Sequence, residues 1–122
     1  MESKELCTAI VQSLDKHKGA DIQVLYISDL TSITDYFVIV EGTSSTHVKS
    51  LSDYVEVDME EKGIRVHHKE GYNGSAWVLL DYGNVVVHVF QPEAREYYNL
   101  ERLWKDGKAI DLSEFGVSTD NP

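Results

Sequence analysis

The 122-residue sequence lacks the multiple cysteines of disulfide-rich or cysteine-zinc proteins and the long apolar runs of membrane proteins. Its one cysteine, Cys7, allows neither an internal disulfide nor a zinc site made of cysteines, which suits a reducing compartment. No apolar run approaches the ~20 residues that a membrane helix requires. The first residues lack the basic and apolar regions of a signal peptide and are too acidic for a transit peptide. We therefore expect a cytoplasmic protein.

Positive charge is also scarce. The sequence has 11 lysine and arginine residues against 21 acidic residues, which gives a net charge of −10. Because this field repels phosphate backbones, we expect no direct binding to nucleic acid. The same field would attract a basic protein surface. The alternative is that the charge only aids solubility, and net charge alone does not separate these two interpretations.

Motifs for nucleotide chemistry are lacking as well. The sequence has neither GxxxxGK[ST] nor GxGxxG, and no predicted strand carries the paired acids that hold magnesium in nucleotidyltransferases. The turn Gly42-Thr43-Ser44-Ser45 stands between a predicted strand and a predicted helix, where backbone N–H groups could hold a phosphate. Most such turns only cap a helix, so it is at most a candidate vestigial phosphate turn. We expect no catalytic residue, metal or cofactor, and an enzyme acting through this turn is the less favoured alternative.

Hydrophobic spacing predicts the element order α-β-β-α-β-β-β-α in one domain. The helices are expected over residues 3–17 and 46–62 and from residue 91 onward, and the strands over residues 21–27, 36–40, 64–68 and the two arms of a hairpin at 76–90. The last helix has an apolar stripe of Tyr97, Leu100, Leu103 and Trp104.

The order of these elements predicts the fold class α/β (α+β), with a mixed five-stranded sheet and packed helices. The step from the second strand through a helix to the third favours a right-handed crossover. The other connections favour antiparallel pairs. We expect residues 1–110 to form the domain and residues 111–122 to form a flexible C-terminal tail.

The hairpin is the clearest element, because the two-residue turn Gly83-Asn84 fixes its register. Side chains alternate along each arm and separate two faces. One face is nearly all aliphatic and is expected to lie under helices: Val78, Leu80, Tyr82, Val85, Val87 and Val89. The other face combines aromatic, acidic and imidazole groups, as protein-binding hot spots do: Trp77, Leu79, Asp81, Val86, His88 and Phe90. The alternative is that a helix covers this face as core, and the residues support both interpretations equally.

The hairpin sequence also resembles the signature of a known family, the Iojap/RsfS ribosomal silencing factors. Four segments carry the resemblance and together span nearly the whole chain outside the tail: residues 77–90, 29–39, 42–48 and 97–104. One departure lies in the hairpin turn, where Asn84 stands at a position that is usually aspartate in the family. Asparagine suits such a turn at least as well.

The resemblance implies a nucleotidyltransferase-like fold without catalysis and a homodimer. It also implies binding to the large ribosomal subunit through its protein number fourteen, which blocks joining with the small subunit and represses translation when nutrients are short. A role as a large-subunit assembly factor needs the same docking and stays open. The predicted partner-binding residues, for the ribosome or for a second protomer, are Trp77, Leu79, Asp81, His88 and Phe90.

Overall fold

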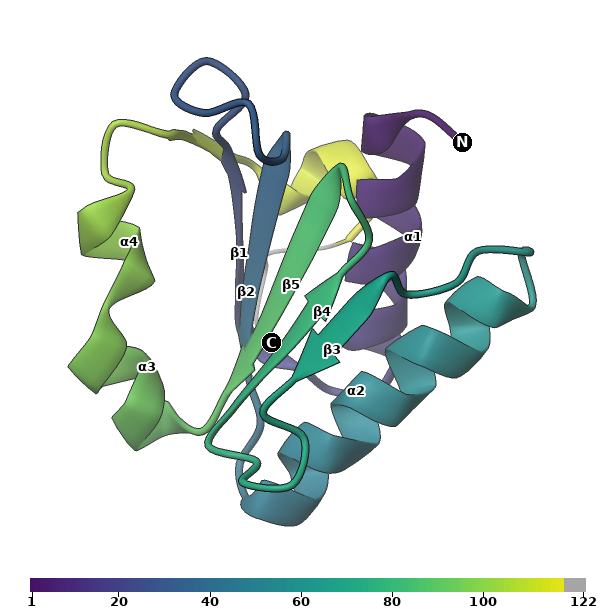
Figure 1. Cartoon of the computed structure of the whole chain (residues 1–122), viewed down its shortest axis with the longest axis vertical. Coiled ribbons are helices and arrows are strands. Elements are labelled where there is room, and N and C mark those ends of the chain that lie inside the picture. Colours follow the sequence, from purple (N-terminus) through teal and green to yellow (C-terminus); the bar gives the residue numbers. More distant parts are fainter. Residues whose placement is uncertain (118–122) are drawn as a thin grey trace.

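A computed structural model describes residues 1–117 of the chain. One mixed sheet has two long helices on one face and two short helices on the other (Figure 1). The strands are β1 (Ala20–Tyr26), β2 (Tyr36–Glu41), β3 (His68–Glu70), β4 (Trp77–Asp81), β5 (Val85–Phe90) and β6 (Lys108–Ile110). The helices are α1 (Ser3–Lys16), α2 (Ser45–Glu60), α3 (Pro92–Tyr98) and α4 (Leu100–Leu103), followed by the 3₁₀ turn η1 (Leu112–Phe115). Within residues 1–117, no helix is long and apolar enough to cross a membrane.

The sheet has six strands in the order β3-β4-β5-β2-β1-β6, so the predicted mixed sheet is confirmed and its predicted count of five was wrong. β2 and β5 run parallel at the centre, and the other neighbouring strands run antiparallel. The strand that the sequence missed is β6. It has only three residues and no alternating pattern, and it becomes a strand by pairing with Val24–Tyr26 of β1.

The larger core lies between the sheet and helices α1 and α2. On α1, Leu6, Ile10 and Leu14 recur every four residues and are buried, as their spacing predicts. The aliphatic face of the hairpin is buried against the same helices, which confirms that half of the prediction. Each such aliphatic side chain contributes about 1.5–3 kcal/mol when it is fully removed from water.

The hairpin has the predicted register. Trp77 lies opposite Phe90, Leu79 opposite His88, and Asp81 opposite Val86. The turn closes with Gly83 at φ +87°, a left-handed conformation that glycine adopts at little cost. One face of β4 and β5 therefore turns away from α1 and α2.

The third strand and the last helix differ from the prediction. β3 begins at His68, because only His68–Glu70 pair with β4 at this sheet edge. The last helix is interrupted at Asn99, which has φ +46° and separates α3 from α4. The break leaves Tyr97 81% and Leu103 73% exposed, so they do not pack as the predicted stripe.

The packed domain continues past the predicted boundary at residue 110. Asp111 caps η1 by accepting a hydrogen bond from the backbone N–H of Ser113 at 2.9 Å. The turn buries Phe115, which is 1% exposed, and Val117 follows it into the larger core. Residues 112–117 thus lie where the sequence predicts a tail, and residues 118–122 lie outside the described residues.

Candidate partner-binding site

The face of the hairpin opposite α1 and α2 is divided between core and surface. Phe90 is fully buried in a second, smaller core that includes Ile39 and Leu100. Trp77 is half-buried and stacks on Phe90, with ring centroids 5.0 Å apart. The interpretation as core therefore holds for Phe90, while Trp77 remains partly open to solvent.

An exposed aromatic patch extends outward from Trp77. We use this term for Trp77, Tyr97, Tyr98 and Leu103. The ring of Tyr98 lies 4.8 Å from that of Trp77 and 5.0 Å from that of Tyr97, and Tyr98 is 46% exposed. Tyr97, Tyr98 and Leu103 also line a shallow hollow of about 570 Å³ with Arg102. The patch thus joins β4 to the surface of α3 and α4, and these two helices lie at the left of Figure 1.

His88 lies beneath the patch, with only 3% of its surface exposed. Its Nδ1 accepts a hydrogen bond from the indole Nε1–H of Trp77 at 3.1 Å. The ring of Phe37 meets it edge-on at 4.6 Å. Burial lowers the pKa of His88 from 6.5 to about 4, so the imidazole is neutral at physiological pH.

The remaining predicted partner-binding residues are Leu79 and Asp81, and both are half-buried. The carboxylate of Asp81 accepts a hydrogen bond from the backbone N–H of Gly83 at 2.7 Å, so it stabilises the hairpin turn. The sequence allowed a contact between Asp81 and His88. Instead, His88 bonds to Trp77 and Asp81 to the turn.

Arg95 fixes α3 and α4 over the sheet. This buried arginine donates to one carboxylate oxygen of Glu101 through Nε at 3.0 Å and through a terminal nitrogen at 2.8 Å. It also donates to the carboxylate of Glu41 at 3.2 Å and to the backbone carbonyl of Asp21 at 2.8 Å. One side chain therefore ties α3 to α4, to β1 and to β2, and it sets where Tyr97 and Tyr98 stand.

The candidate phosphate turn is closed by its own side chains. The backbone N–H of Thr43 donates to Nδ1 of His47 at 2.9 Å, and Ser44 caps α2 by accepting from the N–H of His47 at 3.1 Å. A Cβ at Gly42 would lie 2.8 Å from the backbone nitrogen of Val48, so glycine is required for close packing. Ser45 begins α2. Helix capping and packing account for this turn without a phosphate.

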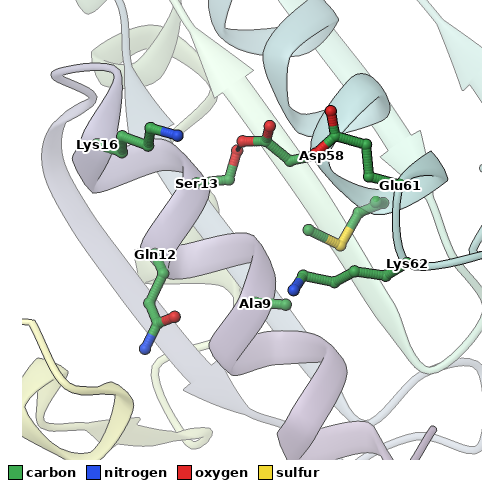
Figure 2. Close-up of a pocket in the computed structure, with 8 residues that line it drawn as sticks. Ala9, Gln12, Ser13, Lys16, Asp58, Glu61 and Lys62 are labelled. Atoms are coloured by element: carbon green, nitrogen blue, oxygen red, sulfur yellow. Dashed lines mark hydrogen bonds between the residues drawn. The ribbon is translucent and has the colours of Figure 1, made fainter.

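A groove between α1 and α2 is a further depression of the surface, with a volume of about 390 Å³ (Figure 2). Ser13 on α1 donates a hydrogen bond to Asp58 on α2 at 2.6 Å. The charges that line the groove balance one another, since Lys16 and Lys62 offset Asp58 and Glu61. None of the predicted site residues lines it, and it has the character of a solvated seam between two helices.

Reactive groups are sparse in the described part of the chain. Burial raises the pKa of the Cys7 thiol to about 12, so the thiolate that a nucleophile requires is not formed at neutral pH. Among residues 1–117, no three histidine, cysteine or acidic side chains converge to hold a metal.

The family model for "ribosomal silencing factor during starvation", RsfS, matches residues 1–122. The ribosomal silencing factor RsfS of Bacillus subtilis is 36% identical over 118 residues, which is 97% of this chain and 99% of that protein. The chain belongs to the ribosomal silencing factor family. The resemblance seen in the sequence is thereby confirmed.

Solved and more distant relatives agree with this assignment. A crystal structure of a Chromobacterium violaceum protein has a TM-score of 0.84 and 38% identity, covering 91% of this chain and 92% of that one. A mouse relative named mitochondrial assembly of ribosomal large subunit protein 1 is 34% identical over 98 residues, which is 78% of this chain and 43% of that protein. Family members thus carry names for both silencing and assembly.

Sequence reasoning missed the outer part of the patch. It assigned Tyr97 and Leu103 to the apolar stripe of one continuous helix and did not single out Tyr98. The spacing of residues 97, 100, 103 and 104 is that of an ordinary buried helix face, so no local pattern marks Tyr97 and Leu103 as exposed.

Proposed function

We propose that this protein is a ribosomal silencing factor that binds the large ribosomal subunit through its protein number fourteen. Bound there, it occupies space that the small subunit needs, blocks subunit joining and represses translation under nutrient limitation. The observation that carries the proposal is the exposed aromatic patch in a chain of this family. Large aromatic side chains around one half-buried tryptophan are the residues that dominate protein–protein binding energy.

The charge of the protein supports a basic protein partner. The net charge of −10 speeds encounter with a positively charged surface and disfavours contact with exposed RNA phosphates. Acidic residues Glu93 and Glu96 flank the patch on α3 and are exposed. They would meet basic side chains at the rim of the interface, while the aromatic groups supply most of the affinity.

The same proposal includes a non-catalytic role in the cytoplasm and a homodimer in the unbound state. The candidate phosphate turn is occupied by His47, and the described residues offer no metal cluster, both of which favour docking over transfer chemistry. The exposed aromatic patch is also the surface that a second protomer would cover. Dimerisation and ribosome binding would then compete for it.

A second candidate is a role in assembly of the large subunit. The printed name of the mouse relative supports it, since that relative shares 34% identity with this chain. Both roles use the same docking surface. They differ in the state of the ribosome: silencing acts on finished subunits, whereas loss of an assembly factor leaves incomplete ones.

The proposed contact is tested by substituting Tyr97→Ala and Trp77→Ala and measuring binding to purified large subunits. Tyr97 is 81% exposed, so its loss should weaken binding with little effect on stability. Trp77→Ala should weaken binding by ~2 kcal/mol, which is roughly 30-fold. Tyr54→Ala is a matched control, because Tyr54 is 47% exposed on α2 and lies outside the patch.

Each outcome has a defined meaning. Unchanged binding by folded Trp77→Ala and Tyr97→Ala variants would remove the patch from the ribosome contact. Size-exclusion chromatography of the same variants tests the dimer. If they become monomeric while ribosome binding is kept, the patch is the surface between protomers instead.

A further inference from the structure

We propose that His88 is a positioning residue, which fixes the indole of Trp77 in the orientation that the exposed aromatic patch presents to its partner. The inference deepens the proposed function and rests on it for the binding measurement. His88 is 3% exposed, so it does not reach the partner itself.

The hydrogen bond between the two residues fixes the roles of both ring nitrogens of His88. An indole N–H only donates, so Nδ1 of His88 must accept at the observed 3.1 Å. The neutral imidazole therefore carries its proton on Nε2. This tautomer is a direct consequence of the geometry and can be measured.

His88 is held firmly enough to orient another side chain. Its ring packs against Phe37 at 4.6 Å and lies 6.3 Å from that of Phe90. Its cross-strand neighbours are Ile39 on β2 and Leu79 on β4. A residue enclosed on several sides has one conformation, and the acceptor at Nδ1 has one location.

Packing alone does not explain a histidine at this position. Nε2 of His88 is buried and has no hydrogen-bond partner within the described structure. A buried unpaired polar atom is unfavourable, and an aliphatic or phenyl ring would fill the space without it. The feature that only the imidazole supplies here is the acceptor for Trp77.

The orientation of the Trp77 indole depends on that acceptor. It is half-buried, and its other aromatic contacts are the stacked ring of Phe90 at 5.0 Å and the tilted ring of Tyr98 at 4.8 Å. Ring contacts are tolerant of rotation, whereas a hydrogen bond selects one edge of the indole. An interface tryptophan that is already ordered binds more tightly, because less side-chain freedom is lost on binding.

The test compares His88→Leu with His88→Asn, two side chains of nearly the same shape. The amide oxygen of asparagine occupies the place of Nδ1 and keeps the acceptor, while leucine removes it. Asparagine buries more unpaired polar atoms, so it should give the less stable protein. We expect the opposite order for binding: His88→Leu should bind large subunits about fivefold more weakly than the wild type, and His88→Asn within about twofold.

A purely structural role for His88 would make binding follow stability, and that result would overturn the inference. In a Trp77→Phe background the two substitutions should bind equally, since no indole N–H remains to be held. A persisting difference in that background would also overturn it. Failure of the wild type itself to bind large subunits would instead contradict the proposed function.

A spectroscopic measurement on the wild-type protein keeps the inference testable even if both variants fail to fold. Nitrogen-15 chemical shifts of His88 report its tautomer, and we expect the proton on Nε2 with a coupling between Nδ1 and the indole nitrogen of Trp77. The Trp77→Phe and Trp104→Phe variants assign the two indole signals. A proton found on Nδ1 would refute the hydrogen bond and the role derived from it.

Discussion

Acid should destabilise this protein through the buried imidazole of His88. Burial holds the pKa of His88 at about 4, whereas an unfolded chain has the usual value of 6.5. Between these values the unfolded state binds a proton that the folded state excludes. The contribution of His88 is therefore complete above pH 6.5 and is lost as the pH falls toward 4.

The magnitude follows from the two pKa values. One pKa unit corresponds to about 1.4 kcal/mol, so lowering the pH from 7 to 5 should cost about 2 kcal/mol through His88 alone. Below pH 4 the whole contribution of His88 to the free energy of unfolding, about 3 kcal/mol, is lost. Such a loss is a large fraction of the ~5–15 kcal/mol that stabilises a typical domain.

Urea unfolding of the wild type and of His88→Leu at several pH values between 7.5 and 5 measures the pH-dependent contribution of His88 to stability. The substitution leaves every other titratable group in place, so the difference between the two curves isolates His88. We expect the free energy of unfolding of the wild type to fall about 2 kcal/mol further than that of the variant. Parallel curves would refute the assignment of a buried, neutral imidazole.

Three further substitutions test other parts of the structure by urea unfolding. Arg95→Met should lower the free energy of unfolding by about 2 kcal/mol, because it leaves the carboxylates of Glu41 and Glu101 without their cation. The loss is moderate because both carboxylates keep some contact with water. A change within 0.5 kcal/mol would contradict the role of this network. Gly42→Ala should cost about 1–3 kcal/mol, since the new methyl group would overlap the backbone at Val48. Phe115→Ala should cost about 3–5 kcal/mol, because this side chain is 1% exposed, and a neutral result would show that η1 does not belong to the packed domain.

The central part of the fold could be predicted from the sequence because local rules and packing agree there. The two-residue turn at Gly83 fixes the register of β4 and β5, and alternation then assigns their faces. The four-residue spacing on α1 likewise predicts its buried side. In these elements, each residue's preference is the one that the whole fold requires.

The ends of the sheet could not be predicted, because long-range pairing creates them. β6 is three residues long and exists through its contact with β1, about 85 residues earlier in the chain. Phe115 enters the core although Ser113 and Glu114 directly precede it, and such a polar stretch predicts a tail. No local pattern reports such contacts.

The candidate site was only partly accessible to sequence reasoning for a similar reason. The hairpin register places Trp77 near His88, but the hydrogen bond between them depends on side-chain conformations that the sequence does not encode locally. The outer part of the patch depends on the helix break at Asn99 and on the tertiary contacts of Arg95. Arg95 bonds to Asp21, far away in the sequence, and thereby sets where Tyr98 meets Trp77.

Sedimentation with separated ribosomal subunits tests the central claim most directly. The protein would be mixed with large subunits, small subunits or both, at a magnesium concentration that lets subunits join, and then centrifuged through a sucrose gradient. We predict that it sediments with the large subunit and lowers the amount of joined ribosomes, and that Trp77→Ala does neither. Sedimentation with the small subunit, or normal joining in the presence of bound protein, would contradict the account.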